Sequence, residues 1–363
     1  MNDEILGCLF GGAVGDASGA PLEFYGSEMT DDAVSEAMGM SGGGALNIGV
    51  GRLTDDSELA ISLMSSLVLH APEEGFPADT VALSYIAWFE SRPFDIGNTC
   101  RMAMNLTLSG RDDEHPAQQM MLQSKQYSMD SEANGSLMRC AAIGVWARHL
   151  SNDVIADYAK QDALLSHPNE VCQDVNAVFC ILIAYLIKNP RDFKGATKLL
   201  DQPNCGLKDE LHESVKSWIE SSKMKDISAL DCSVFIGHVK HAFILTLFFL
   251  RNNFDYEKAI FMTLKKGGDT DTNAAIVGNL IGCLKGYVSI PEYMVQPVLA
   301  FDCSTHVDTD NSPGYNRPER YRSKHITDFS SKLSAREVKI MGSIPSDVTL
   351  LPSTELPELK SVS

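Results

Sequence analysis

Apolar residues recur along this chain at intervals of three and four positions, and few runs alternate with the two-residue period of strands. This spacing is typical of helices that bury one face, so the pattern predicts an all-α fold with short connections. No fixed-period repeat of the solenoid kind is present. Helices are predicted over residues 4–19, 55–70, 77–91, 97–108, 136–148, 152–165, 169–188, 208–221, 233–250, 255–266 and 270–286.

The first predicted helix carries a glycine at every fourth position, namely Gly7, Gly11, Gly15 and Gly19. Glycine is a poor helix former. A stripe of glycines on one face therefore indicates a packing requirement: the backbone of another element can approach closely there. Asp16 lies near the end of this helix, Pro21 ends it, and Glu23 follows in the turn.

Three stretches lack a strong helical pattern. Residues 28–53 are rich in glycine and read as a loop, and residues 110–135 are polar and are expected to cover a site. Residues 303–363 have only a weak helical segment, near 327–338. The chain is therefore divided into a main helical domain, an irregular extension and a flexible tail, at residues 1–302, 303–340 and 341–363.

Two acidic clusters, far apart in the chain, each open a predicted helix. They are Thr54-Asp55-Asp56-Ser57 and Asp269-Thr270-Asp271-Thr272, and neither contains Lys or Arg. Either cluster alone is explained by the helix dipole, which favours carboxylates in a first turn. If both helix starts meet in the fold, however, the carboxylates repel one another unless a cation lies between them. Asp16 and Glu23 would add further oxygen donors to such a group.

Oxygen donors of this kind favour Mg²⁺, with manganese or calcium as alternatives, over zinc. Two ions a few ångströms apart could clamp an oxygen-rich substrate and orient a water molecule for attack. A phosphate ester, a diphosphate or a vicinal diol would suit such a site.

Composition narrows the classes of partner. The formal net charge of −18 argues against general nucleic-acid binding, although a nucleotide ligand stays possible. The nine cysteines form no Cys-x-x-Cys motif, which fits reduced thiols in the cytoplasm. The acidic N-terminus lacks the features of a signal peptide, and the most apolar stretch, 242–250, is too short to cross a membrane. We therefore expect a cytoplasmic protein that does not bind membranes.

Five short blocks follow one another along residues 5–300: Gly11–Glu23, Leu53–Ser57, Asp95–Thr99, Asn134–Arg139 and Gly267–Ala274. In this order and spacing they resemble the ADP-ribosylglycohydrolases, a family that includes dinitrogenase-reductase-activating glycohydrolase and the ADP-ribosyl-acceptor hydrolases. The Thr-Asp-Asp block is weak by itself, but the five blocks in order are highly specific.

The resemblance implies a compact, single-domain orthogonal helix bundle with two Mg²⁺ ions, or Mn²⁺, at converging helix N-termini. It implies a hydrolase that cleaves the N- or O-glycosidic bond between ADP-ribose and an acceptor, which reverses ADP-ribosylation. The acceptor could be a protein side chain such as arginine or serine, or a small conjugate, and a monomer is expected. By motif, the metal ligands would be Thr54, Asp55, Asp56, Asp269, Asp271 and Thr272.

The resemblance also suggests roles in the reaction. Nearby carboxylates would stabilise the oxocarbenium character that develops as the bond breaks. Acid–base work is assigned to Asp269 or Asp56, with Glu23 as a gating or proton-handling group. The division of labour between them stays open.

Further residues are assigned to substrate binding. Asn134, Gly135 and Ser136 are expected to begin a helix and to hold the diphosphate, the alternative being an ordinary N-cap. His167 would lie near the adenine, and Asn98 would line the acceptor side. Each of these two is also explained as an ordinary residue at a helix end.

Arg139 is expected to be structural, pairing inside the bundle rather than binding phosphate. Where many relatives have Gly-Tyr-Val, this chain has Gly237-His238-Val239, which leaves acceptor specificity open.

The sequence disfavours two other classes of function. A non-catalytic ADP-ribose binder or structural member would be expected to have lost ligand carboxylates, and this chain keeps them. An enzyme of prenyl diphosphates needs a DDxxD pattern, whereas Ser57, Glu58 and Leu59 follow Asp55 and Asp56. The hydrolase is therefore the favoured reading.

Overall fold

The computed structural model describes residues 2–25, 29–106, 114–304 and 316–335, and it confirms the all-α prediction. Within these ranges there is no strand, only two isolated bridges, Gly43–Ile48 and Ala133–His238. The α-helices are α1 (Asp3–Gly19), α2 (Asp31–Met38), α3 (Asp55–Leu67), α4 (Ala78–Glu90), α5 (Asn98–Met104), α6 (Pro116–Ser128), α7 (Ala141–Trp146), α8 (Asn152–Leu164), α9 (Glu170–Lys188), α10 (Phe193–Leu200), α11 (Glu213–Ser221), α12 (Val239–Arg251), α13 (Tyr256–Leu264), α14 (Thr270–Lys285), α15 (Glu292–Ala300) and α16 (Lys324–Ala335). Short 3₁₀ turns are η1 (Ala20–Leu22), η2 (Pro72–Glu74), η4 (Pro203–Gly206), η5 (Tyr287–Ser289) and η6 (Glu319–Tyr321).

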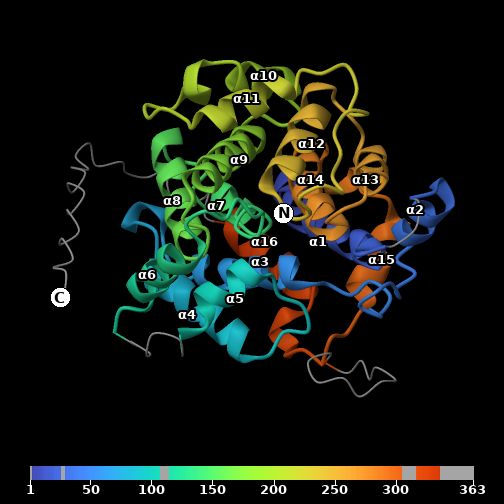
Figure 1. The fold of residues 1–363 in the computed structure, drawn as a ribbon, viewed down its shortest axis with the longest axis horizontal. Helices are drawn as coiled ribbons and strands as arrows, with labels where there is room; N and C mark the ends of the chain where they lie inside the picture. The colour runs from blue at the N-terminus through green and yellow to red at the C-terminus, as the bar shows by residue number, and fades with distance from the viewer. Residues whose placement is uncertain (1, 26–28, 107–113, 305–315, 336–363) are drawn as a thin grey trace.

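Helices α1 and α14 pack directly against each other near the centre of the molecule (Figure 1). A Cβ atom added to Gly11 would lie 2.6 Å from the carbonyl oxygen of Gly278, and one added to Gly7 would lie 2.3 Å from that of Gly282. The glycine stripe of α1 therefore meets a second pair of glycines on α14. The predicted close approach of another backbone to this stripe is confirmed.

The remaining helices surround this pair. Helices α12 and α13 pack on α14, α8 packs on α9, and α4 packs on α3. Two segments are long and apolar enough to span a membrane: Asp3–Leu22, which comprises α1 and η1, and α9. The most apolar window of the first is 94% buried inside the protein, and that of α9 is 83% buried. Both are accounted for as core helices of the bundle.

The segment 28–53, predicted as a loop, and the polar segment 110–135 each contain a helix, and the sequence pattern also did not predict α10 and α15. Helix α2 lies inside residues 28–53; Thr30 caps it by accepting a hydrogen bond from the Ala33 amide. Helix α6 lies inside residues 110–135 and begins at Pro116, a residue favoured at the first helical position. Helix α2 has only eight residues, and the buried face of α6 includes the polar Gln123, Ser124 and Ser128, so neither gives a long run of periodic apolar residues. Residues 107–113 lie outside the described part of the chain.

Three predicted helices begin later than expected: α7 at Ala141, α11 at Glu213 and α12 at Val239. The segments before α7 and α12 pair instead: the Asn134 amide donates to the Gly237 carbonyl at 2.9 Å, and the Val239 amide donates to the Glu132 carbonyl at 2.9 Å. The prediction that Asn134, Gly135 and Ser136 begin a helix is therefore wrong. These residues form a turn, because the bridge between Ala133 and His238 holds the backbone extended just before it.

The segment 316–335 folds against the main bundle. Helix α16 contacts α1 and α3, and its Ile326 is buried. Arg148, two residues after the end of α7, donates from Nη2 to the carbonyl of Leu333 at 3.1 Å. The weak segment predicted near 327–338 overlaps α16, and the predicted tail, 341–363, lies outside the described residues.

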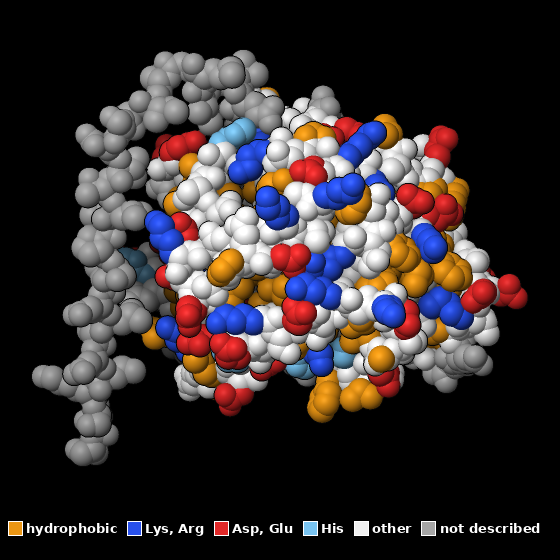
Figure 2. Space-filling view, turned by 90° about the horizontal axis from the view of Figure 1, so that it is seen from above, with side chains coloured by type: hydrophobic (Ala, Val, Ile, Leu, Met, Phe, Trp, Pro, Cys, Tyr) orange, Lys and Arg blue, Asp and Glu red, His pale blue; other side chains and the backbone are white. Residues whose placement is uncertain are grey.

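Charges of both signs mix on the face of the molecule shown in Figure 2, with small apolar areas between them. No broad basic area is visible on that face of the described residues.

The glycine contact between α1 and α14 yields a test. Changing Gly15 to alanine would place a Cβ atom 2.1 Å from the carbonyl oxygen of Ala274, so the two helices would have to separate. We expect the free energy of unfolding to fall by roughly 1–3 kcal/mol, as for other overpacked cores. Urea titration followed by circular dichroism measures it. The control is Gly97→Ala, where a Cβ meets nothing within 4 Å and φ is −63°. Equal losses for both variants would contradict this account.

Candidate metal centre

Asp16 of α1 takes the place of a local cap at the start of α3. Its carboxylate accepts hydrogen bonds from the Thr54 amide, at 3.1 Å, and from the Thr54 hydroxyl, at 2.8 Å. It also accepts from the amide, at 3.3 Å, and the hydroxyl of Ser57. The first amides of a helix have no partner within it. Asp16 satisfies two such donors from another helix and thereby fixes α3 against α1.

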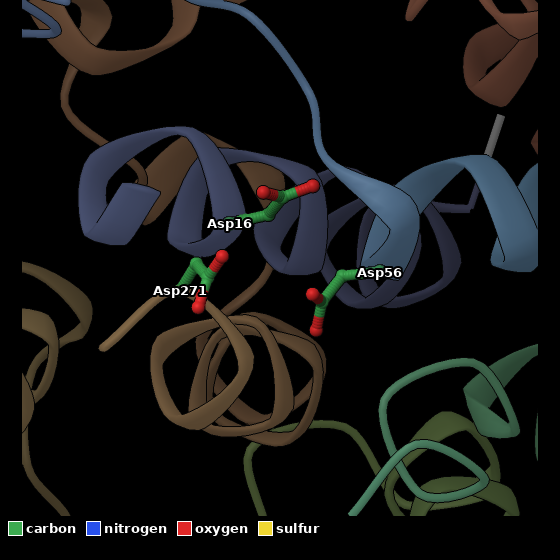
Figure 3. A group of neighbouring side chains, drawn as sticks. All are labelled: Asp16, Asp56 and Asp271. Carbon is green, nitrogen blue, oxygen red and sulfur yellow. The ribbon is translucent and has the colours of Figure 1, made fainter. Parts of the chain in front are cut away.

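The starts of α3 and α14 meet, as predicted from the two acidic clusters. The Thr272 hydroxyl donates to Asp56 Oδ2 at 3.3 Å, and the Thr54 hydroxyl contacts the same oxygen at 3.2 Å. One oxygen from each of Asp16, Asp56 and Asp271 lies within 4.8 Å of the others. Figure 3 shows these three side chains, which come from α1, α3 and α14.

A second group of carboxylates adjoins the first and shares Asp271. Oxygens of Glu23, Asp269 and Asp271 also lie within 4.8 Å of one another. The amide nitrogen of Asn134 donates to Asp269 Oδ2 at 2.8 Å and so orients that carboxylate. The Thr270 hydroxyl donates to the Gly19 carbonyl at 2.8 Å, which fixes the start of α14 against the end of α1.

These two groups offer only oxygen ligands, the kind that hard divalent cations bind. Two of their buried oxygens, Asp56 Oδ1 and Glu23 Oε2, have no hydrogen-bond partner among the described residues. A buried carboxylate oxygen without a partner is costly. A cation held in either group could satisfy such an atom, so the residues present fit metal binding. The carboxylates grouped closely enough to hold it are Asp16, Asp56, Asp271, Glu23 and Asp269, and Asp55, Asp95 and Thr272 line the cavity beside them. That Thr54, Asp55, Asp56, Asp269, Asp271 and Thr272 are the metal ligands stays a prediction.

Electrostatics agree with this reading. Burial raises the pKa of Asp16 to about 6, although hydrogen bonds from Ser57 and Thr54 act in the opposite direction. Burial, with the nearby Asp95 and Asp269, raises the pKa of Glu23 to about 8. Burial and neighbouring carboxylates also raise the pKa values of three further residues well above their ordinary value: Asp55, Asp56 and Asp271. Without a cation, the cluster resists ionisation.

A cavity of about 350 Å³ opens beside the cluster. Most of the predicted site residues line it: Glu23, Asp55, Asn98, Asn134, Gly135, His167, Asp269, Asp271 and Thr272. Thr54, Asp56 and Ser136 are buried and do not line it. The structure thus brings the two predicted metal-binding stretches and the predicted substrate-binding blocks to one place.

Sequence reasoning missed Asp95 as a candidate ligand. It lines the cavity three residues before α5, and burial, with Asp269 nearby, raises its pKa. The sequence contained a signal for this residue, because Asp95 is the first residue of the Asp95–Thr99 block, in which only Asn98 was assigned a role. The cavity lining also includes Phe24 and Ile236, which are exposed apolar side chains that no pattern singled out.

Arg139 is structural, as predicted. Its guanidinium pairs with Asp162 at 3.1 Å, with both side chains fully buried, and donates to the Gly135 carbonyl at 2.9 Å and to the Ser166 hydroxyl at 2.9 Å. That hydroxyl also contacts His167 Nδ1 at 2.8 Å. Burial, with Arg139 nearby, lowers the pKa of His167 well below its usual value, so its ring is neutral. The network holds Gly135 and His167 together on one wall of the cavity.

The raised pKa values predict how metal binding depends on pH. Without metal, a carboxyl group whose pKa is raised by folding stabilises the folded state at acid pH. This contribution is lost as the pH rises through about 6 for Asp16 and about 8 for Glu23. A bound cation favours the ionised forms. We therefore expect the rise in melting temperature caused by MgCl₂, relative to EDTA, to grow between pH 5.5 and 8.5. Thermal melts at several pH values measure it, and a rise that is the same at all of them would contradict the prediction.

The comparisons with known proteins agree with this geometry. The sequence model of the family described as ADP-ribosylglycohydrolase matches residues 1–311. A protein of Acanthamoeba polyphaga mimivirus, provisionally named an ADP-ribosyl glycohydrolase, is 29% identical over 308 residues, covering 80% of this chain and 89% of that one. The ADP-ribosyl-[dinitrogen reductase] glycohydrolase of Rhodospirillum rubrum is 26% identical over 295 residues, covering 80% and 88%.

Two further matches extend this likeness. ADP-ribosylarginine hydrolase Tri1 of Pseudomonas putida (strain GB-1) is 24% identical over 306 residues, covering 82% of this chain and 74% of that one. A solved structure titled ADP-ribosylglycohydrolase-related protein complex has the same fold, with a TM-score of 0.68, 20% identity and coverage of 92% and 98%. From the family match over residues 1–311, this chain belongs to the ADP-ribosylglycohydrolase family.

Proposed function

We propose that this protein is a magnesium-dependent hydrolase that releases ADP-ribose from a modified acceptor and so reverses ADP-ribosylation. The observation that carries the proposal is the pair of carboxylate groups that share Asp271, beside a cavity of about 350 Å³. Two groups sharing one bridging carboxylate suit two ions, and the oxygen-only donor set favours Mg²⁺, with Mn²⁺ as the alternative. The family membership and the names of its relatives support the reaction class.

When bound, the ions would supply Lewis acidity and positions for the ribose hydroxyls. The protein's own groups would then act around the anomeric carbon. Asp55, Asp95 and Asp269 place negative charge on the cavity wall, which stabilises a positively charged oxocarbenium-like transition state. Asn134 keeps Asp269 oriented through its hydrogen bond of 2.8 Å.

Glu23 is suited to proton transfer. It lines the cavity, and its Oε2 atom is buried without a hydrogen-bond partner among the described residues, so this oxygen can take up or release a proton. We propose that Glu23 handles the proton of the leaving group or of the incoming water. Asp56 lies behind the wall and Asp269 on it, so Asp269 is the better placed of the two carboxylates first considered for acid–base work.

We propose arginine on a protein as the acceptor, before serine or a small conjugate. One relative is named as a hydrolase of ADP-ribosylarginine, and another acts by name on ADP-ribosyl-dinitrogen reductase. A guanidinium is positively charged, and the cavity wall that it would approach is rich in carboxylates, including Glu23 and Asp95. Charge complementarity of this kind favours encounter with a basic acceptor.

We further propose a monomer that works in the cytoplasm. Each of the nine cysteines is buried and free, with no disulfide between them, which suits a reducing compartment.

Removing a carboxylate from either cluster tests the metal assignment. We expect Asp55→Ala and Asp271→Ala each to reduce the release of free ADP-ribose by at least about a hundredfold, because each removes a candidate ligand from the centre. Helix content should be unchanged by circular dichroism. The matched control is Asp209→Ala, an exposed aspartate away from the cavity, which should keep full activity. Unchanged turnover in either site variant would refute the assignment.

An activity panel tests the reaction and the acceptor together. Arginine-linked, serine-linked and small-molecule-linked ADP-ribose are incubated with the protein, with EDTA and then with added Mg²⁺, and free ADP-ribose is measured. We expect turnover of the arginine-linked substrate that is lost with EDTA and restored by Mg²⁺. Turnover of the serine-linked substrate alone would overturn the acceptor proposal. Calorimetric binding of ADP-ribose without hydrolysis of any substrate would indicate the non-catalytic binder instead.

A further inference from the structure

A buried ion pair lies directly behind the metal-binding end of α3. Glu58 follows Asp55 by three residues, and its side chain is 3% exposed. Its carboxylate accepts hydrogen bonds from Arg317 Nη2 at 2.8 Å and from Arg317 Nε at 3.0 Å, and from Trp88 Nε1 at 2.7 Å. The Arg317 side chain is fully buried. A guanidinium bound through two nitrogens holds a carboxylate in one orientation, which a lysine cannot do.

The same guanidinium also holds the end of α4. Arg317 Nη1 donates to the carbonyl of Ser91 at 2.8 Å, and Nη2 donates to the Ser91 hydroxyl at 2.8 Å. Ser91 is the C-cap of α4, and the chain reaches Asp95 four residues later. One buried side chain therefore ties the start of α3 to the segment that delivers Asp95.

Asp55 and Asp95 lie beyond this tie, on the wall of the cavity. Asp55 comes from the first turn of α3, and Asp95 comes from the segment between α4 and α5. A second contact joins the same two segments: the guanidinium of Arg52 lies 4.3 Å from the centre of the Phe94 ring. Arg52 is two residues before Thr54, and Phe94 directly precedes Asp95. Two contacts therefore link the segment around Asp55 to the segment that leads to Asp95.

We propose that Arg317 is a positioning residue for the cation centre, which sets the separation of Asp55 from Asp95 by clamping Glu58 and Ser91 together. The inference rests on the proposed cation site. It extends that site beyond residue 311, where the family's sequence model ends. Arg317 lies on a segment that the sequence pattern assigned to an irregular extension, and it does not line the cavity. Groups that orient metal ligands commonly alter affinity by 10- to 100-fold when they are changed.

The test is calorimetric titration of the full chain with MgCl₂, which reads metal affinity independently of turnover. Arg317→Lys keeps the positive charge but loses the guanidinium that binds Glu58 through two nitrogens. We expect the affinity of this variant for Mg²⁺ to fall by at least about tenfold. The control is Arg148→Lys, another fully buried arginine that contacts the same C-terminal segment, through the Leu333 carbonyl. It should lower the melting temperature while leaving Mg²⁺ affinity unchanged.

Ser91→Ala is the milder second variant, which removes one of the two contacts at the end of α4 and should weaken Mg²⁺ binding in the same direction. It carries the test if Arg317→Lys does not fold by circular dichroism. If the variants that fold, Arg317→Lys, Ser91→Ala or both, bind Mg²⁺ as tightly as the wild-type protein, the inference is overturned and the proposed function stands. An equal loss of affinity in Arg148→Lys would also overturn it, since the effect would then be one of general stability. Failure of the wild-type protein to bind Mg²⁺ would remove both the inference and the metal centre.

Discussion

The contact between α1 and α14 through bare backbone is the constraint on which the site depends. Helices with ordinary side chains pack with their axes 8–10 Å apart. Here Gly7 and Gly11 face Gly282 and Gly278, and an added Cβ atom on any of them would fall within 2.6 Å of the other helix's backbone. Asp16 and Asp271, one on each helix, are consequently delivered to the same point. A wider contact would leave Asp16 able to hold α3 but would move Asp271 away from it.

The fold concentrates negative charge where burial makes it costly. Several carboxyl groups with raised pKa values gather at the starts of α3 and α14. The free amides and dipoles of these helix ends offset part of the repulsion. Much of the hydrogen-bonding capacity of Asp16 is already used by Thr54 and Ser57, whereas Asp56 and Glu23 each keep an oxygen without a partner. The site therefore divides into groups that hold the scaffold and groups left free for a cation.

Two buried arginines, Arg139 and Arg317, connect the segments that carry the acidic centre. Arg139 joins the turn at Gly135 to α8 through Asp162, and Arg317 joins α3 to the end of α4 through Glu58. Each positive charge is paired with its own carboxylate, so neither neutralises the cluster. Because a guanidinium makes several directed hydrogen bonds, it can fix the spacing of three segments at once. The C-terminal segment, which lies beyond the family's sequence model, takes part in this framework.

The sequence by itself determined the fold class, the glycine-lined face of α1, the family and most residues of the site. These follow from local patterns: helical spacing, small residues at every fourth position and acidic starts of helices. It missed α2, α6, α10 and α15, three of which have only eight or nine residues, and it placed Asn134, Gly135 and Ser136 at a helix start. Only the tertiary structure decided that these three residues form a turn. The backbone at Glu132 and Asn134 pairs with Val239 and Gly237, about a hundred residues away in the chain, and this pairing keeps the segment from starting a helix. The same reason explains Asp95 and Arg317: what each contributes depends on which distant carboxylate it meets, and no local pattern carries that information.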